Sequence, residues 1–173
     1  MLSDPASFAI LVFRLAIGAV FIAHGYNHLW GPGKVAGTAR WFASIGMRPP
    51  LLHAWVASVT EVGAGLMLIL GLLTPLAGAA VIGVMVVAWI ANHRKNGFFI
   101  FRPGEGYEYV MTLTAAGVLF AGVGGGHWSL DALFGIANPP GWPLTAFALA
   151  AGFVGAAGLL AGCWRPGSPT KSA

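Results

Sequence analysis

The sequence predicts an all-α fold, a polytopic bundle of transmembrane helices. Of its 173 residues, 57% are hydrophobic and 8% are charged, whereas roughly one quarter of the residues in a soluble domain are charged. Five apolar stretches approach or exceed the roughly 20 residues that cross a bilayer. No soluble domain or long linker interrupts them, so we expect a single membrane domain over residues 1–173, with spans at about 8–30, 53–73, 75–92, 108–124 and 143–164.

The first three spans follow from apolar length and one turn signal. The stretch 8–30 has no basic segment before it and is interrupted by Arg14, so it is interpreted as a helix and not as a secretory signal. The apolar run 53–91 is about twice the length that a bilayer needs. Thr74-Pro75 lies at its centre and predicts a tight turn between two helices.

The last two spans complete the bundle. The fourth is short on its own, but Tyr107 and Trp128 flank it as expected of aromatic residues at membrane interfaces. The fifth, 143–164, is long enough to cross a membrane without help. Small residues four positions apart predict close approach of helix backbones at Ala79 to Gly83 and at Gly158 to Gly162.

The basic residues test this count, because cytoplasmic loops are enriched in lysine and arginine. With five spans, every basic residue except Arg14 falls on one side: Lys34, Arg40, Arg48, Arg94, Lys95, Arg102, Arg165 and Lys171. We therefore predict a multi-pass protein of the cell membrane with its N-terminus outside and its C-terminus in the cytoplasm. The scattered cations favour contact with the lipid bilayer over nucleic-acid binding.

The connecting segments carry three further expectations. The loop after the first span is amphipathic, and its apolar residues are expected to face lipid at the cytoplasmic interface: Val35, Ala39, Trp41, Phe42 and Ile45. A short helix is expected from Ser129 or Asp131, with His127 and Asp131 in an exposed polar turn. Cys163 is the only cysteine, which excludes an intrachain disulfide and a cysteine-ligated iron–sulfur cluster.

Ionisable residues inside a span are costly unless they meet a partner, which makes them candidates for function. His24, Asn27 and His28 share one face of the first helix, because they are three and four positions apart. At 1.5 Å per residue, His24 lies about 9 Å from the inner end of its span and Glu61 about 12 Å from the inner end of the next. The two side chains are therefore expected at the same depth.

The third and fourth spans bring His93 and Glu108 to the same cytoplasmic half. We predict a pocket in which Glu61 and His24 relay protons, while His93 and Glu108 orient or gate. Its binding residues are expected to be Asn27, His28, Tyr26, Trp30, Trp55, Trp89 and Arg14. Arg14 lies toward the outer side, where pairing with a backbone carbonyl or with Asp131 is an alternative to a role in binding.

Three chemistries fit this cluster. A quinone headgroup needs a donor or acceptor at each carbonyl, a proton route, and apolar or aromatic walls. Two histidines and a carboxylate are also a metal-ligand set, but coordination needs convergence on one point, and we assign no metal ligand. The third is a path for protons or small ions. The structural alternative is a His–Glu pair that only holds helices together.

At these residues the chain resembles the DoxX family of small membrane proteins. The pieces that carry the resemblance run in order over about residues 14–134: "RLAIGAVFIAHGYNHLWG", "EVGAGLMLILGLLTPLAG", "WIANHRKNGFF", "GYEYVMTLTAAGVLF" and "GGGHWSLD". The family is usually described as four-helix, so the resemblance implies a four-helix core with the span 143–164 as an addition. It also implies association with membrane oxidoreductase assemblies, including quinone-linked and oxidative-stress complexes of the bacterial inner membrane.

We therefore expect a membrane subunit of an oxidoreductase system with a cytoplasmic-side site for quinone or a small redox ligand, without activity alone. Other subunits or soluble redox enzymes at the cytoplasmic face are the expected partners. One alternative is a non-catalytic anchor that docks such enzymes through its two basic inner loops, in which reversing the charges of Arg94, Lys95 and Arg102 would release the partner. Another is a proton-coupled transporter of a small solute.

Overall fold

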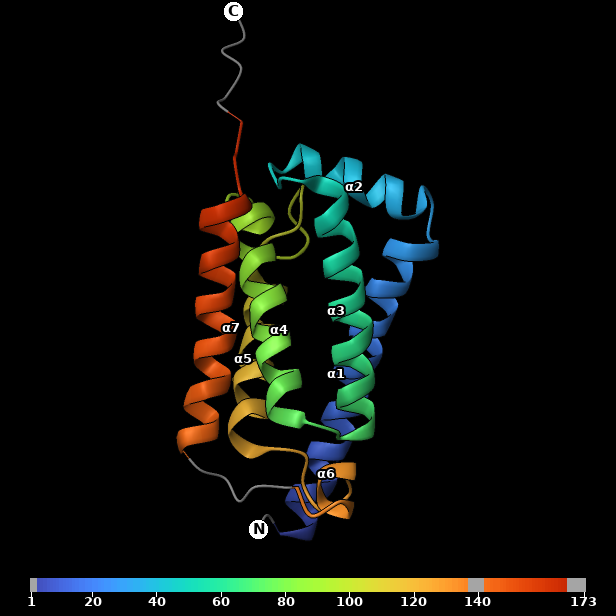
Figure 1. Ribbon diagram of the computed structural model, residues 1–173, viewed down its shortest axis with the longest axis vertical. Coiled ribbons are helices and arrows are strands. Elements are labelled where there is room, and N and C mark those ends of the chain that lie inside the picture. Colours follow the sequence, from blue (N-terminus) through green and yellow to red (C-terminus); the bar gives the residue numbers. More distant parts are fainter. Residues whose placement is uncertain (1–2, 137–141, 168–173) are drawn as a thin grey trace, which may run out of the picture.

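The computed structural model describes residues 3–136 and 142–167, and within these ranges the chain is all helical. Four helices are long and apolar enough to cross a membrane: α1 (Asp4–Trp30), α3 (Pro50–Leu70), the continuous α4 (Thr74–Ala88) and η1 (Trp89–His93), and α7 (Trp142–Cys163). The apolar helix α5 (Glu108–Val123) is shorter and lies alongside them (Figure 1). The predicted all-α membrane bundle is confirmed.

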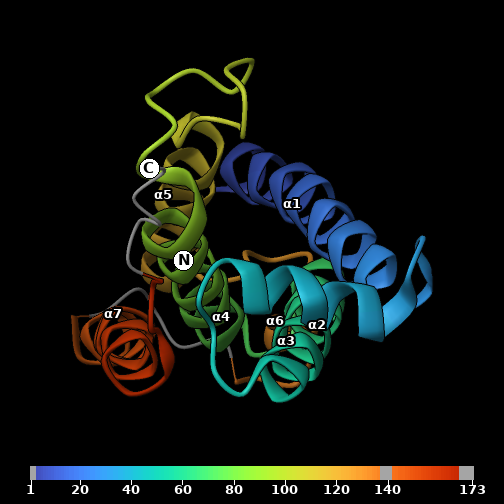
Figure 2. The same cartoon turned by 90° about the horizontal axis from the view of Figure 1, so that it is seen from above.

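Two groups of helices make up the bundle. Helix α1 packs mainly on α3, whereas α4 packs on α5 and α7 (Figure 2). Buried side chains of α1, α3, α4 and α5 form the shared core, among them Phe21, Leu68, Val81 and Phe120. Helix α7 packs beside this core through a separate cluster of Ala79, Ala121 and Ala148, and most of its surface faces outward.

Glycines set the spacing within each group. A Cβ atom on Gly18 would lie 2.8 Å from the carbonyl oxygen of Gly65, and one on Gly65 would lie 2.7 Å from the oxygen of Gly18. Gly78 and Gly117 make the same reciprocal approach between α4 and α5. Side chains at these points would push the backbones apart, so the glycines determine how each helix pair is rotated and aligned.

On α7 the close backbone contact lies at Gly152, and not at Gly158 and Gly162 as predicted. A Cβ atom on Gly152 would meet the carbonyl oxygen of Ala79, which agrees with the close approach expected at that residue of α4. A Cβ atom on Gly158 or Gly162 would instead meet nothing within 4 Å, so the spacing of these two glycines does not mark a helix contact.

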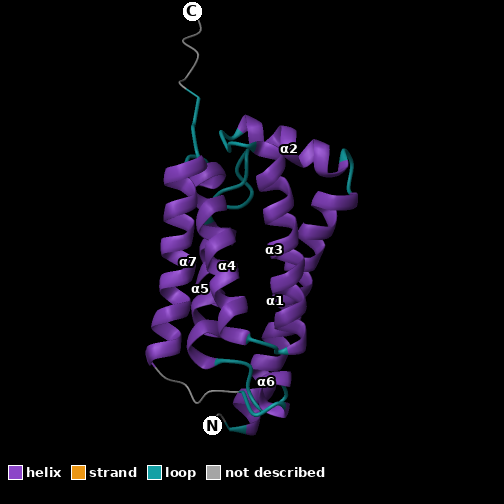
Figure 3. Ribbon diagram, viewed as in Figure 1, coloured by secondary structure: helices purple, strands orange, loops and turns teal. Residues whose placement is uncertain are grey.

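Helix α2 (Lys34–Ser44) lies across one end of the bundle (Figures 1 and 3). Its apolar face was expected to meet lipid, but Phe42 is buried with Met47 and Ala54, and Ile45 packs against this cluster. Trp41 alone of the predicted apolar face is largely exposed. The expectation was wrong because the ends of α3, α4 and α7 offer an apolar surface that a one-dimensional pattern does not reveal.

Backbone contacts join the segment after α2 to the end of α7. The amide of Arg48 donates to the carbonyl of Cys163 at 2.8 Å, and the amide of Arg165 donates to Gly46 at 2.7 Å. Trp164 donates its indole N–H to the carbonyl of Ile45 at 2.9 Å and lies under the guanidinium of Arg94. The described basic residues outside the membrane spans lie at this end, which we call the basic end: Lys34, Arg40, Arg48, Arg94, Lys95, Arg102 and Arg165. The assignment of this end to the cytoplasm stays a prediction.

A polar cluster closes the opposite end. Arg14 is buried and donates to the carbonyl oxygens of Leu68 at 2.7 Å and Trp128 at 2.6 Å, as the backbone-pairing alternative predicts. Asp131, in the short helix α6 (Leu130–Leu133), accepts from the amides of Leu73 and Thr74 at the start of α4. The expected exposed turn was therefore wrong for Asp131, which is buried because it caps a helix N-terminus in another part of the chain.

Candidate functional site

A cavity of about 530 Å³ extends along α4, from Leu76 near the start of that helix to His93 at the basic end. Side chains from α1, α2, α3, α4, η1, α5 and α7 line it, and most of them are apolar. Its polar lining consists of His24, His28, His53, Thr60, Glu61, Asn92, His93, Glu105 and Tyr109. An apolar cavity with a few convergent polar groups is the usual form of a small-molecule site.

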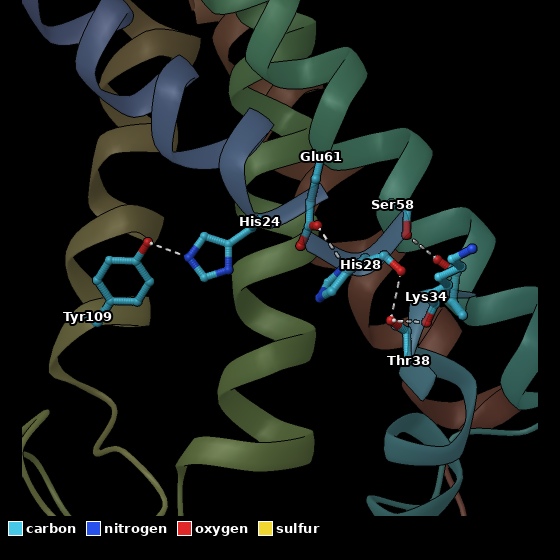
Figure 4. A network of polar contacts seen from close by, with 8 residues as sticks. His24, His28, Lys34, Thr38, Ser58, Glu61 and Tyr109 are labelled. Carbon is cyan, nitrogen blue, oxygen red and sulfur yellow. Dashed lines mark hydrogen bonds and ion pairs between the residues drawn. The ribbon is translucent and has the colours of Figure 1, made fainter. Parts of the chain in front are cut away.

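Glu61 and His28 form the central polar contact. Glu61 is 5% exposed, and its Oε2 lies 3.0 Å from Nδ1 of His28. The orientation of these two atoms falls outside hydrogen-bonding geometry, and both atoms lack a hydrogen bond; the contact is an ion pair when His28 is protonated. In Figure 4 the Glu61 side chain points from α3 toward α1, into the space between His24 and His28. The contact joins α1 to α3 inside the membrane-spanning region.

His24 faces a different partner from the one expected. Its Nε2 lies 3.3 Å from the hydroxyl of Tyr109 on α5, and the two rings stack with centroids 6.1 Å apart (Figure 4). His24 and Glu61 still line one small cavity of about 20 Å³, together with Tyr109. His24 and Glu61 are therefore close in space, but the imidazole paired with the carboxylate is that of His28.

The third span brings His93 to the cavity through a π-helical turn, η1. His93 is buried, with Nδ1 at 2.9 Å from the carbonyl oxygen of Glu105 and Nε2 at 3.3 Å from the side-chain amide of Asn92. The extra residue per turn in a π-helix rotates the positions that follow it, and such turns are frequent at functional sites. His93 therefore contacts the cavity from the basic end, as predicted.

His53 was missed by the sequence analysis. It is buried on the cavity wall, and its Nε2 lies 3.0 Å from the carbonyl oxygen of Arg48. The signal was present, because positions 53, 57 and 61 are separated by four residues each and so share a helix face. His53 was instead taken as the start of the span. Tyr109 and Thr60 were also missed as lining residues.

The structure does not bring three predicted residues to the cavity. The Glu108 carboxylate turns into the preceding loop and accepts the amide N–H of Ile100 at 3.1 Å. Asn27 lies exposed near the end of α1. Arg14 is at the opposite end of the bundle, where backbone carbonyls bind its guanidinium. None of the three lines the cavity.

The predicted aromatic walls are also placed elsewhere. Tyr26 and Trp30 pack on each other and are exposed, as is Trp55, whereas Trp89 stacks on Tyr107. At about 100° per residue, Trp55 is rotated by about 240° from Glu61, and Trp30 by the same angle from His24, so neither shares its polar partner's face. The aromatic walls are instead Trp41 and Phe42 of α2.

The polar groups do not form a metal centre. No cluster of three or more histidine, cysteine, aspartate or glutamate side chains with metal-binding geometry occurs in residues 3–136 and 142–167. The arrangement instead supplies a buried carboxylate, imidazoles able to donate or accept a proton, and a phenol, around an apolar space. Such groups suit a ligand that carries polar atoms on an apolar body.

The fold and the cavity define a multi-pass helical membrane protein with polar side chains gathered inside its bundle. A family model described as DoxX matches residues 9–94. The chain is 34% identical to inner membrane protein YphA of Escherichia coli (strain K12) over 125 residues, which cover 70% of this chain and 87% of that protein. The chain belongs to the DoxX family. No solved structure matches it.

Proposed function

We propose that the protein is an inner-membrane subunit of an oxidoreductase system and that its cavity binds the headgroup of a quinone or a small redox ligand. The observation that carries this proposal is the Glu61–His28 ion pair on the wall of a largely apolar cavity. A carboxylate away from water costs several kcal/mol unless a partner compensates it, so a purely structural contact between α1 and α3 would be served as well by apolar side chains. The pair is placed where a bound ligand can reach it.

The residues around the cavity fit a quinone. A quinone ring has an apolar body with two carbonyl oxygens, and its reduction requires protons as well as electrons. In this proposal His28 and Glu61 supply a proton beside the ligand, and Glu61 shares the wall of one small cavity with His24 and Tyr109. His93, with Asn92, faces the ligand from the basic end.

Electrons must come from a partner. In this proposal the protein contributes binding and proton transfer, through Glu61, His28 and the other polar residues of the cavity. This division of roles agrees with the association of DoxX-like proteins with oxidoreductase complexes. The donor is then another subunit or a soluble enzyme at the basic end.

The proposal is tested by Glu61→Gln, which keeps the size of the side chain and removes its charge. Wild type and variant are purified with their partners in mild detergent, and bound quinone is extracted and measured by mass spectrometry. Without the carboxylate, His28 loses its charged partner and donates less strongly to a quinone carbonyl oxygen. We therefore expect about tenfold less bound quinone, which equals about 1.4 kcal/mol. Quinone-linked turnover is expected to be lost in a complex that still assembles.

Glu108→Gln is the matched control, because it makes the same change on a carboxylate that lies outside the cavity. We expect quinone content and turnover in this control to match wild type. Absence of quinone from wild type, or equal quinone in wild type and Glu61→Gln, would reject the proposal.

One observation favours a non-catalytic anchor as the second candidate. The loop between η1 and α5 exposes Phe98, Phe99 and Phe101 beside Lys95 and Arg102 at the basic end. Aromatic and basic side chains together are typical of surfaces that bind proteins or lipid headgroups. If the protein is only an anchor, Glu61→Gln leaves the partner's turnover unchanged.

A further inference from the structure

The cavity is a groove along the side of the bundle. Helix α4 forms its floor, and α3 and α7 stand on either side of α4 (Figures 1 and 2). Helix α7 packs on α4 and α5, while α3 packs on α1, α2 and α4. Two lining residues, Val56 on α3 and Leu76 on α4, are 44% and 48% exposed, so the groove reaches the outer surface of the bundle where lipid lies.

The groove has a polar half and an apolar half. Its polar residues lie from the level of Glu61 to the basic end, and the small cavity places Glu61 beside Met85 of α4. Beyond Met85, the floor continues to Leu76 through residues that are all apolar, a distance of about 14 Å at 1.5 Å per residue. The wall that α7 contributes is also without polar side chains. Ala151, Gly152 and Gly155 lie toward the apolar half, whereas Ala156 and Leu159 lie toward the basic end, where Leu159 packs with Phe42 and Met47.

This arrangement fits an elongated ligand with one polar end. The buried Glu61 carboxylate, whose Oε2 accepts no hydrogen bond, faces the polar half. A compact ligand would occupy that half alone and would leave the apolar half open to the membrane. A ligand with a hydrocarbon tail fills both halves and covers apolar surface along its whole length, which stabilises it by about 25 cal/mol for each Å² buried.

We propose that the apolar half of the groove binds the prenyl tail of a quinone whose headgroup lies at Glu61, and that the quinone enters from the lipid between α3 and α7. This inference rests on the proposed function, because it assigns the tail of the same ligand. It gives α7, which lies outside the residues that match the DoxX family, a defined part in ligand selection.

Gly155 is the position at which the tail can be blocked without disturbing the helix packing. It lines the groove, and a Cβ atom added to it meets nothing within 4 Å. Gly158, one turn further along α7, is equally open but does not line the groove. Gly155→Phe therefore places a ring in the tail's path, and Gly158→Phe adds the same ring to the same helix outside it.

The experiment measures binding of ubiquinone with a single isoprene unit and of ubiquinone with a long prenyl tail to full-length protein in lipid nanodiscs. Tail length also changes the partition of a quinone into lipid, so each affinity is expressed relative to that of wild type for the same quinone. We expect Gly155→Phe to weaken the long-tailed quinone about tenfold, which equals about 1.4 kcal/mol, and to leave the short-tailed one within about twofold. Gly158→Phe is expected to bind both as wild type does.

The outcomes separate the two proposals. If wild type binds neither quinone, the proposed function itself fails. If wild type binds both but Gly155→Phe weakens neither or both equally, the headgroup site stands and the tail groove is rejected. Mass spectrometry of the bound fraction provides a second measurement, because a phospholipid that stays bound when the long-tailed quinone is added would identify an acyl chain, not a prenyl tail, as the occupant.

Discussion

Asp131 links the short helix α6 to the start of α4, and its replacement by asparagine tests how much this contact stabilises the fold. Asp131 Oδ1 accepts from the amide of Leu73 at 2.6 Å, and Oδ2 accepts from the amide and the hydroxyl of Thr74 at 2.9 and 2.7 Å. All three donors point at the carboxylate. In Asp131→Asn one oxygen becomes an NH₂ group, so in either orientation a donor faces a donor and at least one buried N–H loses its partner.

The cost follows from the geometry. An unsatisfied buried N–H costs about 1 to 3 kcal/mol, and loss of a negative charge at a helix N-terminus adds about 0.3 to 1 kcal/mol. We therefore expect the free energy of unfolding to fall by about 1 to 4 kcal/mol, which corresponds to a decrease in Tm of roughly 3 to 16 °C for a chain of this size. Thermal unfolding in mild detergent, followed by circular dichroism, measures the change.

Asp4→Asn is the control, since Asp4 is also an acid at this end of the protein. Its carboxylate contacts His127 at 3.0 Å, but the side chain is 80% exposed, and exposed ion pairs contribute at most about 1 kcal/mol. Equal decreases in Tm for the two variants would refute the reasoning. Because Asp131 lies at the opposite end from the polar half of the groove, the folded fraction of Asp131→Asn is also expected to keep its quinone.

Two further variants test the packing that positions the site. Gly65→Val places a branched side chain against the carbonyl of Gly18 and is expected to separate α1 from α3, which lowers both Tm and quinone content. Gly63→Val is the control, because a Cβ atom added at Gly63 meets nothing within 4 Å, and it is expected to change neither quantity. Equal effects of the two variants would contradict the glycine contact. Phe42→Ala removes the buried ring of α2 above the cavity and is expected to cost about 3 kcal/mol in detergent unfolding, whereas a loss below about 1 kcal/mol would show that α2 is not packed on the bundle.

Sequence patterns alone were sufficient to predict the membrane class, the helices and several of the ionisable residues that line the cavity. Apolar length and the Thr74-Pro75 signal predicted the helices closely, because crossing a bilayer leaves few backbone choices other than a helix. The cost of ionisable groups inside spans correctly selected Glu61 and His93 as lining residues. Residue spacing placed His24 and His28 on one face, and both line the cavity.

Which ionisable side chains contact one another could be seen only once the helices were packed into the bundle. The pairing of Glu61 with His28 and of His24 with Tyr109 depends on how each helix is rotated about its axis. That rotation is set by glycine contacts such as Gly18 with Gly65, which join residues far apart in the chain. The π-helical turn before His93 and the docking of α2 also depend on neighbours that no local pattern names. Spacing along one helix shows which residues share a face. Which residues of other helices that face contacts depends on how the bundle packs.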